Sequence, residues 1–506
     1  MSSSPPKSTH GQILKSSALI GGSSVVSVLV GMIRVKFTAV YLGPLGVGLF
    51  GAYCTILGPL ATLAGMGIGA SGVRQIAEAA GAGDQEKIAR SLLTVRRASR
   101  ISGLLGMLLM LALAYPLSLA TFGNAGQVVP LCILSVTLFI GAVSGGLGAI
   151  LQGLRRIRDM AMQAIAGAVL GLPIVIPMMM LWGVDSIVPM MLVTAMMGLA
   201  ITWWFTRRVK VAAAQMSWRE SWMEARPMLK LGLVFVSTGL MGAGVAYLTR
   251  VIVIRKLGLE ASGLYSAAWM LSSYYVGFIL GAMGADFYPR LTGVNQNHAV
   301  VNRLVNEQTE VGLLMALPGI IATLTLAPLV IMIFYTTKFT PAVELLRWLS
   351  LGLMGRVISW PIGFIMLAKG AKRWFFFSEL AANIVLLGFS WLGVVFYGLV
   401  GTGMAVLAEY VCYTVLVLFI VRQLTGFRWS SACIRLIAFS IFFAAASFII
   451  ATFLPLVWSA AIGALLAAIT GWYSLRTLTR LVGRNPLTAA WEKFRRIIQP
   501  SRNIES

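Results

Sequence analysis

The sequence contains few of the residues on which most enzyme active sites depend. Among 506 residues there are two histidines, four cysteines and 16 acidic residues, against 40 Lys and Arg. The cysteines are isolated, without CxxC spacing, and the patterns GxxxxGK[ST], GxSxG and HExxH do not occur. The sequence therefore predicts no P-loop ATPase, no nucleophilic or zinc catalysis and no disulfide framework. We expect neither an enzyme nor a resident metal or cofactor.

Charge is also scarce, because only 11% of the residues are charged and 58% are apolar. An apolar run of about 20 residues suffices for a helix to cross a bilayer, where every backbone polar group must be satisfied within the segment. The chain has about fourteen such runs, which predicts an all-α membrane protein that leaves little chain for a soluble domain. The predicted spans are 16–41, 47–73, 98–122, 128–152, 160–182, 186–206, 229–254, 262–286, 309–336, 343–367, 374–397, 400–421, 432–454 and 457–477.

The basic residues alternate between the loops. Of the 40 Lys and Arg residues, 32 fall in the N-terminal segment, in every second loop and in the C-terminal tail, whereas the intervening loops hold only Arg255, Lys256 and Lys338. Cytoplasmic loops carry the positive excess, so we expect a multi-pass membrane protein with both termini inside. The formal charge of +24 follows from this bias and predicts contact with anionic membrane lipids rather than with nucleic acid.

The two halves of the chain show a weak internal repeat. At an offset of 215 residues, Gly43 pairs with Gly258 and Gly48 with Gly263. Six spans separate the copies, and an even number preserves orientation, so the sequence predicts two parallel-repeat six-helix bundles around a central cavity, plus two extra C-terminal helices. The predicted parts are a cytoplasmic N-terminal tail 1–15, an N-terminal bundle 16–206, a cytoplasmic linker 207–230, a C-terminal bundle 231–423, helices 13 and 14 in 424–478, and a basic cytoplasmic tail 479–506.

Three motifs near the N-terminus resemble a known family. They are YLGP at 41–44, GLFG at 48–51 and GASGVRQIA at 69–77. Together they are similar to the opening of the polysaccharide-transport branch of the multidrug/oligosaccharidyl-lipid/polysaccharide flippases, which includes the O-antigen translocases. The resemblance implies a flippase that moves a polyprenyl-diphosphate-linked oligosaccharide, an O-antigen, capsule or exopolysaccharide unit, by alternating access. It also implies a polymerase and a chain-length regulator as partners. Many O-antigen members have twelve spans, so a lipid II-type substrate stays open.

Basic residues inside the predicted spans are candidates for the diphosphate. A charge at mid-bilayer costs at least about 2.5 to 3.5 kcal/mol, so such residues usually face a cavity or a partner. Arg34, Lys36, Arg250 and Arg356 are the predicted substrate-binding residues, because guanidinium offers bidentate donors to phosphate oxygens. Arg250 could instead extend to the outer interface, Arg34 and Lys36 point to different sides of their helix, and Arg356 could belong to a structural ion pair.

Acidic residues in the spans are candidates for ion coupling. Glu409 lies near the middle of its span and Glu379 one to two turns inside the preceding one. Either could bind a coupling proton or sodium ion, with Glu409 preferred, or both could pair with Arg356 and only stabilise the bundle. Asp286 and Arg290 are four residues apart at the inner end of a span, which predicts a gating or structural pair.

Glycines spaced four apart indicate where helices approach each other closely. Gly141 and Gly145 form one such pair, and Gly167 and Gly171 another.

Three other functions are compatible with a many-span protein. A cation or drug antiporter of the multidrug branch would favour an acidic cavity, yet the spans hold five basic residues and two acids. A polymerase or ligase needs a long outer loop for its catalytic groups, and the predicted outer loops are short. A structural subunit would leave the cost of the buried charges unexplained.

Overall fold

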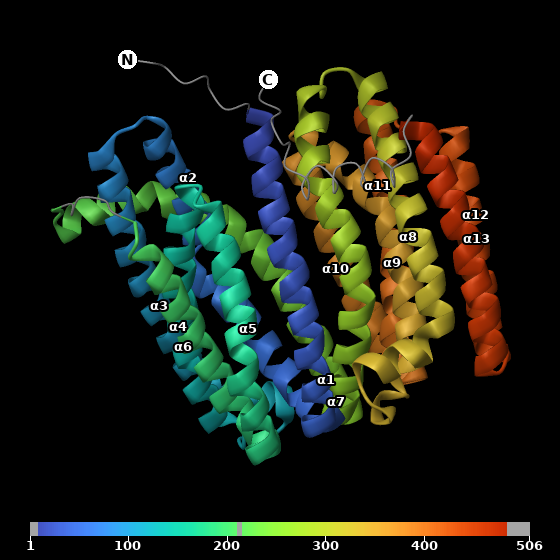
Figure 1. Ribbon diagram of the computed structural model, residues 1–506, viewed down its shortest axis with the longest axis horizontal. Helices are drawn as coiled ribbons and strands as arrows, with labels where there is room; N and C mark the ends of the chain where they lie inside the picture. Colours follow the sequence, from blue (N-terminus) through green and yellow to red (C-terminus); the bar gives the residue numbers. More distant parts are fainter. Residues whose placement is uncertain (1–8, 210–214, 483–506) are drawn as a thin grey trace, which may run out of the picture. The chain divides into compact units, whose positions relative to one another are not determined.

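The computed structural model describes residues 9–209 and 215–482, and this part of the chain is all-helical (Figure 1). The predicted N-terminal tail therefore lies largely outside the described residues, as does the basic C-terminal tail beyond Val482. The helices are α1 (Thr9–Gly65), α2 (Ile68–Gly81), α3 (Gln85–Phe122), α4 (Val128–Gly153), α5 (Ile157–Trp182), η1 (Gly183–Ser186), α6 (Ile187–Thr206), α7 (Trp218–Gly293), α8 (His298–Phe334), η2 (Thr337–Phe339), α9 (Ala342–Ala368), α10 (Lys372–Tyr397), α11 (Val400–Thr425), α12 (Ser431–Phe453) and α13 (Leu456–Val482).

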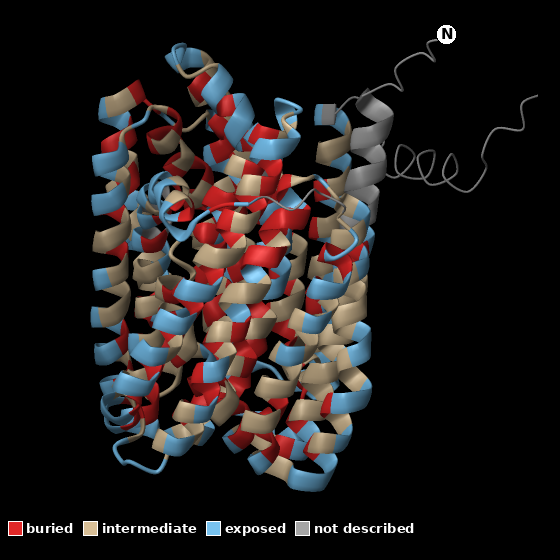
Figure 2. Cartoon of the chain, turned by 90° about the vertical axis from the view of Figure 1, so that its left-hand side faces the viewer, coloured by how far each residue is buried: buried red, intermediate tan, exposed pale blue. Residues whose placement is uncertain are grey.

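Ten segments of the described chain are long and apolar enough to cross a membrane. Two of them, Gly22–Gly81 with 60 residues and Ile157–Thr206 with 50, are more than twice as long as the about 20 residues that one crossing needs. Large apolar side chains are also exposed along the helices, and Figure 2 shows exposed residues over their whole length rather than only at their ends. These features confirm the predicted all-helical, multi-pass membrane protein, while the count of fourteen spans stays a prediction.

The expected loops between the first two spans and between spans 7 and 8 are single-residue breaks in long helices. In α1 the break is Gly43, with φ 63° and ψ −171°, and in α7 it is Gly258, with φ 90° and ψ 176°. Only glycine adopts this backbone region without strain, so a substitution at either position would oppose the break. The two breaks lie 215 residues apart, at the offset of the sequence repeat.

A second repeat-related pair of glycines allows α1 and α7 to cross in close contact. A Cβ atom on Gly48 would lie 2.0 Å from the carbonyl oxygen of Leu259, and one on Gly263 would lie 1.9 Å from that of Pro44. Each of these residues is 215 positions from its counterpart, so the two contacts are equivalent under the repeat. The backbones can come this close only because neither glycine has a side chain.

The chain divides into two compact units. Unit 1 comprises the described residues up to Ser266 with Ile333–Lys338, and unit 2 comprises Ala267–Met332 with the described residues from Phe339. The boundary between the units in α7 thus falls after Ser266, whereas the predicted C-terminal bundle begins at residue 231. The limits of the two bundles stay a prediction.

Unit 1 is built around α4, which packs against α2, α3 and α6. One of its apolar cores combines side chains from α1, α3, α4, α5 and α6, among them Tyr53, Met110, Leu131 and Ile187, each no more than 1% exposed. This core leaves the outer sides of the helices for lipid.

The beginning of α7 docks on α3 within unit 1. Ser217 and Glu220 form a capping box, in which each backbone N–H donates to the other's side chain at 2.7 and 3.2 Å. Glu224, two turns further, accepts hydrogen bonds from Arg90 at 2.7 Å and from Thr94 at 3.1 Å. The second half of the predicted linker 207–230 is therefore helical and anchored.

Unit 2 is organised around α9, which packs against α10, α11 and α12. Its core includes Ile320 from α8 and Leu353 and Val357 from α9, all nearly or fully buried. The last two helices, α12 and α13, contact each other and correspond to the two predicted extra C-terminal helices.

Candidate functional site

Unit 1 contains a buried arginine held by two serines. Arg250 in the first half of α7 is only 7% exposed, so its side chain does not extend to the membrane interface. Its Nη1 donates hydrogen bonds to the hydroxyls of Ser262 at 2.9 Å and Ser266 at 2.7 Å. The guanidinium carbon lies 5.4 Å from the ring centroid of Tyr265, within the range of a cation–π contact. The break at Gly258 turns the chain back, so that these later residues face Arg250.

Room for the guanidinium comes from Gly51 on α1. A Cβ atom there would lie 2.5 Å from Arg250 Nη1 and 2.6 Å from Ser266 Oγ. Gly51 and Ser266 are 215 positions apart, so the glycine of one repeat accommodates the polar residue of the other. This glycine is part of the GLFG motif.

A second arginine lies near the first. Arg34 on α1 and Arg250 both interact electrostatically with Cys54, one turn beyond Gly51. No carboxylate lies within 4.0 Å of either guanidinium in the described part of the chain, and Arg250 Nε is buried without a hydrogen-bond partner there. Lys36, the third predicted cation, donates a hydrogen bond to the backbone oxygen of Tyr335. Arg34 and Arg250 thus share Cys54 as a neighbour, and neither has an acidic partner among the described residues.

Unit 2 contains a cluster of opposite character, formed by α9, α10 and α11. Glu409 on α11 interacts electrostatically with Glu379 on α10 and with Arg356 on α9. Over the described residues, neither carboxylate comes within 4.0 Å of the Arg356 guanidinium, so the expected alternative of a direct structural ion pair is not observed. The two predicted coupling residues and Arg356 nevertheless lie together.

Two tyrosines of α11, absent from the sequence prediction, complete this acidic cluster. The Tyr413 hydroxyl donates a hydrogen bond of 2.6 Å to Glu379 Oε1, and Tyr410 interacts with Arg356 and with both glutamates. Glycines on α9 make room for them, since a Cβ on Gly355 would lie 2.8 Å from Tyr410 Cβ. The sequence feature that could have identified Tyr413 is its spacing, because Tyr413 follows Glu409 by four residues and lies on the same helix face.

The predicted pair Asp286 and Arg290 forms, but on the surface. The carboxylate and guanidinium are 3.3 Å apart, and the side chains are 74% and 68% exposed. Exposed pairs of this spacing contribute about 0.3 to 0.5 kcal/mol, so little energy is available to hold a gate closed. The gating role stays a prediction.

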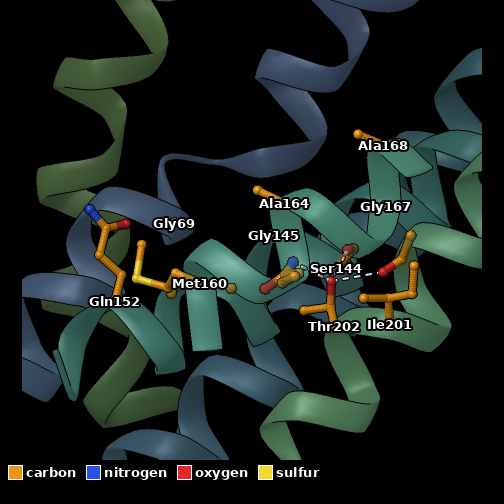
Figure 3. Close-up of a pocket in the computed structure, with 14 residues that line it drawn as sticks. Gly69, Ser144, Gly145, Gln152, Met160, Ala164, Gly167, Ala168, Ile201 and Thr202 are labelled. Carbon is orange, nitrogen blue, oxygen red and sulfur yellow. Dashed lines mark hydrogen bonds between the residues drawn. The ribbon is translucent and has the colours of Figure 1, made fainter. Parts of the chain in front are cut away.

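Two of the glycines that were predicted to lie at helix contacts line a polar cavity in unit 1 instead. Gly145 and Gly167 have no atom within 4 Å of a built Cβ, so the close helix packing expected there is wrong. They line a cavity of about 500 Å³ with Ser144, Gln163 and Thr202 (Figure 3). Gln163 Nε2 donates to Thr202 Oγ1 at 2.6 Å, and the Ser144 hydroxyl lies 3.3 Å from the same oxygen. This cavity offers neutral hydroxyl and amide groups but no charge.

With this geometry established, comparison with known proteins identifies the family. Residues 42–344, more than half of the chain, match the family described as polysaccharide biosynthesis protein. The chain belongs to this family.

Two known proteins are distant relatives of the chain. The chain is 22% identical over 410 residues to the lipid III flippase of Escherichia coli (strain K12), which covers 79% of this chain and 96% of the flippase. The lipid III flippase of Shigella flexneri gives the same values. Both relatives are named as flippases rather than as enzymes, in agreement with the expectation that the chain is not an enzyme.

Solved structures show the same fold. A multidrug resistance MATE family transporter of the MOP superfamily in an inward-facing conformation has a TM-score of 0.67 at 16% identity, covering 79% of this chain and 94% of its own. The lipid II flippase MurJ in an inward closed conformation has a TM-score of 0.66 at 15% identity, covering 92% of this chain and 100% of its own. The expected flippase-superfamily fold is thereby confirmed, with the larger share of this chain covered by the lipid II flippase.

Proposed function

We propose that this protein is a flippase that carries a polyprenyl-diphosphate-linked oligosaccharide across the bacterial cytoplasmic membrane by alternating access. The observation that supports it is the uncompensated positive charge of the buried Arg250 and the half-buried Arg34 in a chain related to a lipid III flippase. Buried cations without acidic partners are costly unless an anion joins them. The diphosphate is the anion that such a carrier lipid supplies.

Arg250 is already oriented to receive it. Its Nη1 is held by Ser262 and Ser266, whereas its Nε has no partner among the described residues. A phosphate oxygen that reaches Nε when the site opens would form a charge-assisted hydrogen bond. Arg34 would add a second guanidinium, and both stay charged at any physiological pH. Lys36 would contribute its positive charge to the attraction of the diphosphate at longer range.

The acidic cluster of unit 2 would couple transport to a proton or sodium gradient. Tyr413 holds Glu379, which leaves Glu409 as the carboxylate available to bind and release a cation. Arg356, predicted to bind the substrate, interacts with Glu409. A diphosphate at Arg356 would weaken its attraction for Glu409, so that substrate and cation binding would influence each other.

The MATE likeness supports a second candidate, an exporter of organic cations, since the TM-score to the multidrug transporter is as high as that to the lipid II flippase. A cationic drug would be repelled by Arg34 and Arg250, whereas a diphosphate would be attracted. The sign of the charge that the protein binds therefore separates the two functions.

Within the flippase proposal, the repeat unit of O-antigen, capsule or exopolysaccharide is the substrate we favour over lipid II. A polymerase and a chain-length regulator would then act on the product at the outer face. The basic residues place both termini in the cytoplasm under this proposal.

Reconstitution tests the function directly. Proteoliposomes holding the purified full chain should move a fluorescent polyprenyl-diphosphate oligosaccharide, and Arg250→Gln should lower the rate about 10- to 100-fold, as expected for a lost hydrogen bond between charged groups. Arg250→Lys should retain part of the rate because a point charge replaces the guanidinium fork. Arg255→Gln, five residues along α7 and exposed, is the matched control.

Transport of an organic cation that is faster in Arg250→Gln than in the wild type would replace the proposal with the antiporter. A polyprenyl-diphosphate rate that stays unchanged in Arg250→Gln would remove this residue from the site. Size-exclusion profiles of all variants separate loss of transport from loss of folding.

A further inference from the structure

A cationic cavity lies in unit 1, and neither Arg34 nor Arg250 lines it. It has a volume of about 710 Å³ and is bounded by α3, α4 and the end of α6. Three arginines line it: Arg96 and Arg100 on α3, and Arg207 directly after α6. The remaining wall is apolar and includes Ile140, Val143, Leu147, Met196 and Leu199.

The three guanidiniums have no acidic partner within the described chain. Arg96 and Arg100 are one helical turn apart, where like charges repel each other. Arg96 Nε is buried without a hydrogen-bond acceptor, a state that costs the desolvation of a charged donor. Arg207 lies over the indole rings of Trp203 at 5.0 Å and Trp204 at 4.0 Å. The cavity therefore concentrates positive charge that an anion would compensate.

The cavity opens away from the packed core. Met196 and Trp203 on its wall are 55% and 54% exposed, and both belong to α6, which ends at this level. Tryptophan is enriched at the depth of the lipid headgroups, and the basic loops that flank α3 and α6 are those predicted to be cytoplasmic. Anionic headgroups gather at that face and attract Lys and Arg. The mouth is thus open to the bilayer at headgroup level, and the apolar wall extends from it.

From this arrangement we infer that the cavity is a binding site for an anionic phospholipid of the inner leaflet. The phosphate lies between Arg96, Arg100 and Arg207, and one acyl chain lies along the wall formed by α4 and α6. The charge selects an anion, and the apolar wall selects a lipid over a soluble phosphate. This site is independent of the proposed carrier site, since it shares no residue with it.

Native mass spectrometry of the purified full chain tests the site, with phosphatidylglycerol as the probe and phosphatidylcholine as the neutral comparison. The wild type should retain one phosphatidylglycerol more tightly than phosphatidylcholine. Arg96→Gln with Arg100→Gln, and separately Arg207→Gln, should weaken that retention about tenfold. Arg208→Gln, the adjacent arginine outside the cavity, should leave it unchanged.

A second variant tests the apolar wall without changing the charge. Ala200→Phe should fill the cavity and lower phosphatidylglycerol retention, while inorganic phosphate should fail to displace the lipid from the wild type. Equal losses in Arg208→Gln and in the cavity variants would show diffuse surface binding and overturn the proposal. Displacement of phosphatidylglycerol by polyprenyl phosphate at equal concentration would also overturn it, because the occupant would then be the carrier lipid. Melting temperatures measured without added lipid confirm that each variant is folded.

Discussion

The two units hold polar clusters of opposite sign. In unit 1 the charges are Arg250, held by the hydroxyls of Ser262 and Ser266, and Arg34, and no acid is within ion-pair distance of either in the described chain. In unit 2 Glu379 and Glu409 lie with Arg356, and Tyr413 donates a hydrogen bond to Glu379. Both clusters occupy space that glycines of a neighbouring helix leave open. The same kind of helix packing therefore accommodates a basic cluster in one unit and an acidic cluster in the other.

This difference suits two separate roles, anion binding in unit 1 and cation binding in unit 2. Serine hydroxyls fix a guanidinium but do not neutralise it, so the cluster of unit 1 keeps its attraction for an anion. A carboxylate beside another carboxylate and a guanidinium is sensitive to the charge of either neighbour, which suits reversible cation binding. Under the proposed function, anion recognition would therefore belong to unit 1 and ion coupling to unit 2.

The strongest test of this division is Glu409→Gln. The neutral amide cannot alternate between a charged and an uncharged state, so we expect stimulation of transport by an imposed proton or sodium gradient to disappear completely. Substrate binding should persist, because unit 1 is unchanged. The measurement is flux in proteoliposomes with and without each gradient. A folded Glu409→Gln protein that responds fully to the gradient would contradict the coupling role.

Gly51→Ala should affect the other cluster while leaving gradient stimulation intact. The added methyl would lie 2.5 Å from Arg250 Nη1, and the flexible guanidinium can move only by giving up its serine partners. We expect substrate affinity to fall about tenfold, as for the loss of one to two hydrogen bonds to a charged group. Gly58→Ala on α1, where the nearest atom to a Cβ is 3.8 Å away, is the control. Equal affinities in the two variants would show that the position of Arg250 is unimportant.

Tyr413→Phe should weaken the cluster of unit 2 without removing a charge. The lost hydrogen bond to Glu379 is worth about 1.5 to 3 kcal/mol in typical proteins, so the melting temperature should fall by a few degrees. Tyr410→Phe is the matched control, because the Tyr410 hydroxyl makes no hydrogen bond among the described residues. Equal destabilisation by the two substitutions would mean that ring packing rather than the hydrogen bond matters.

The smallest expected effect is on stability at acid pH and comes from acids outside the membrane. These acids should not contribute to the pH dependence of transport. Hydrogen bonds from Ser217 hold the pKa of Glu220 below its usual value, and the backbone N–H of Lys87 does the same for the pKa of Asp84. A lowered pKa stabilises the fold above the unfolded-state pKa of about 4 and loses that contribution as the pH falls through the folded value.

Protonation of Glu220 and Asp84 should therefore lower the melting temperature only below about pH 4 and should contribute no change between pH 6 and 8. Glu220→Gln should reduce that acid-side decline slightly. If its melting temperature instead changed relative to the wild type between pH 6 and 8, the pH dependence of transport could no longer be attributed to the cluster of unit 2.

The sequence alone determined the class of protein and the positions of its helices. Apolar runs of bilayer length leave no alternative to membrane-spanning helices, and the motifs between Tyr41 and Ala77 already indicated the family that residues 42–344 match. The repeat offset also placed Gly43 opposite Gly258, and these are the residues at which α1 and α7 break. Local composition and spacing carry this information, because each span must satisfy its own backbone.

The tertiary structure decided which charges meet. Sequence spacing placed Arg250 within reach of the interface, but the break at Gly258 turns Ser262 and Ser266 back onto its guanidinium. Sequence spacing also suggested Arg356 and Glu409 as possible ion-pair partners. In the structure, α9, α10 and α11 hold the two residues near each other without direct pairing. Gly145 and Gly167 line a cavity instead of a helix contact, because what faces a glycine depends on the helices packed around it. Contacts between distant segments follow from packing, and no local pattern encodes them.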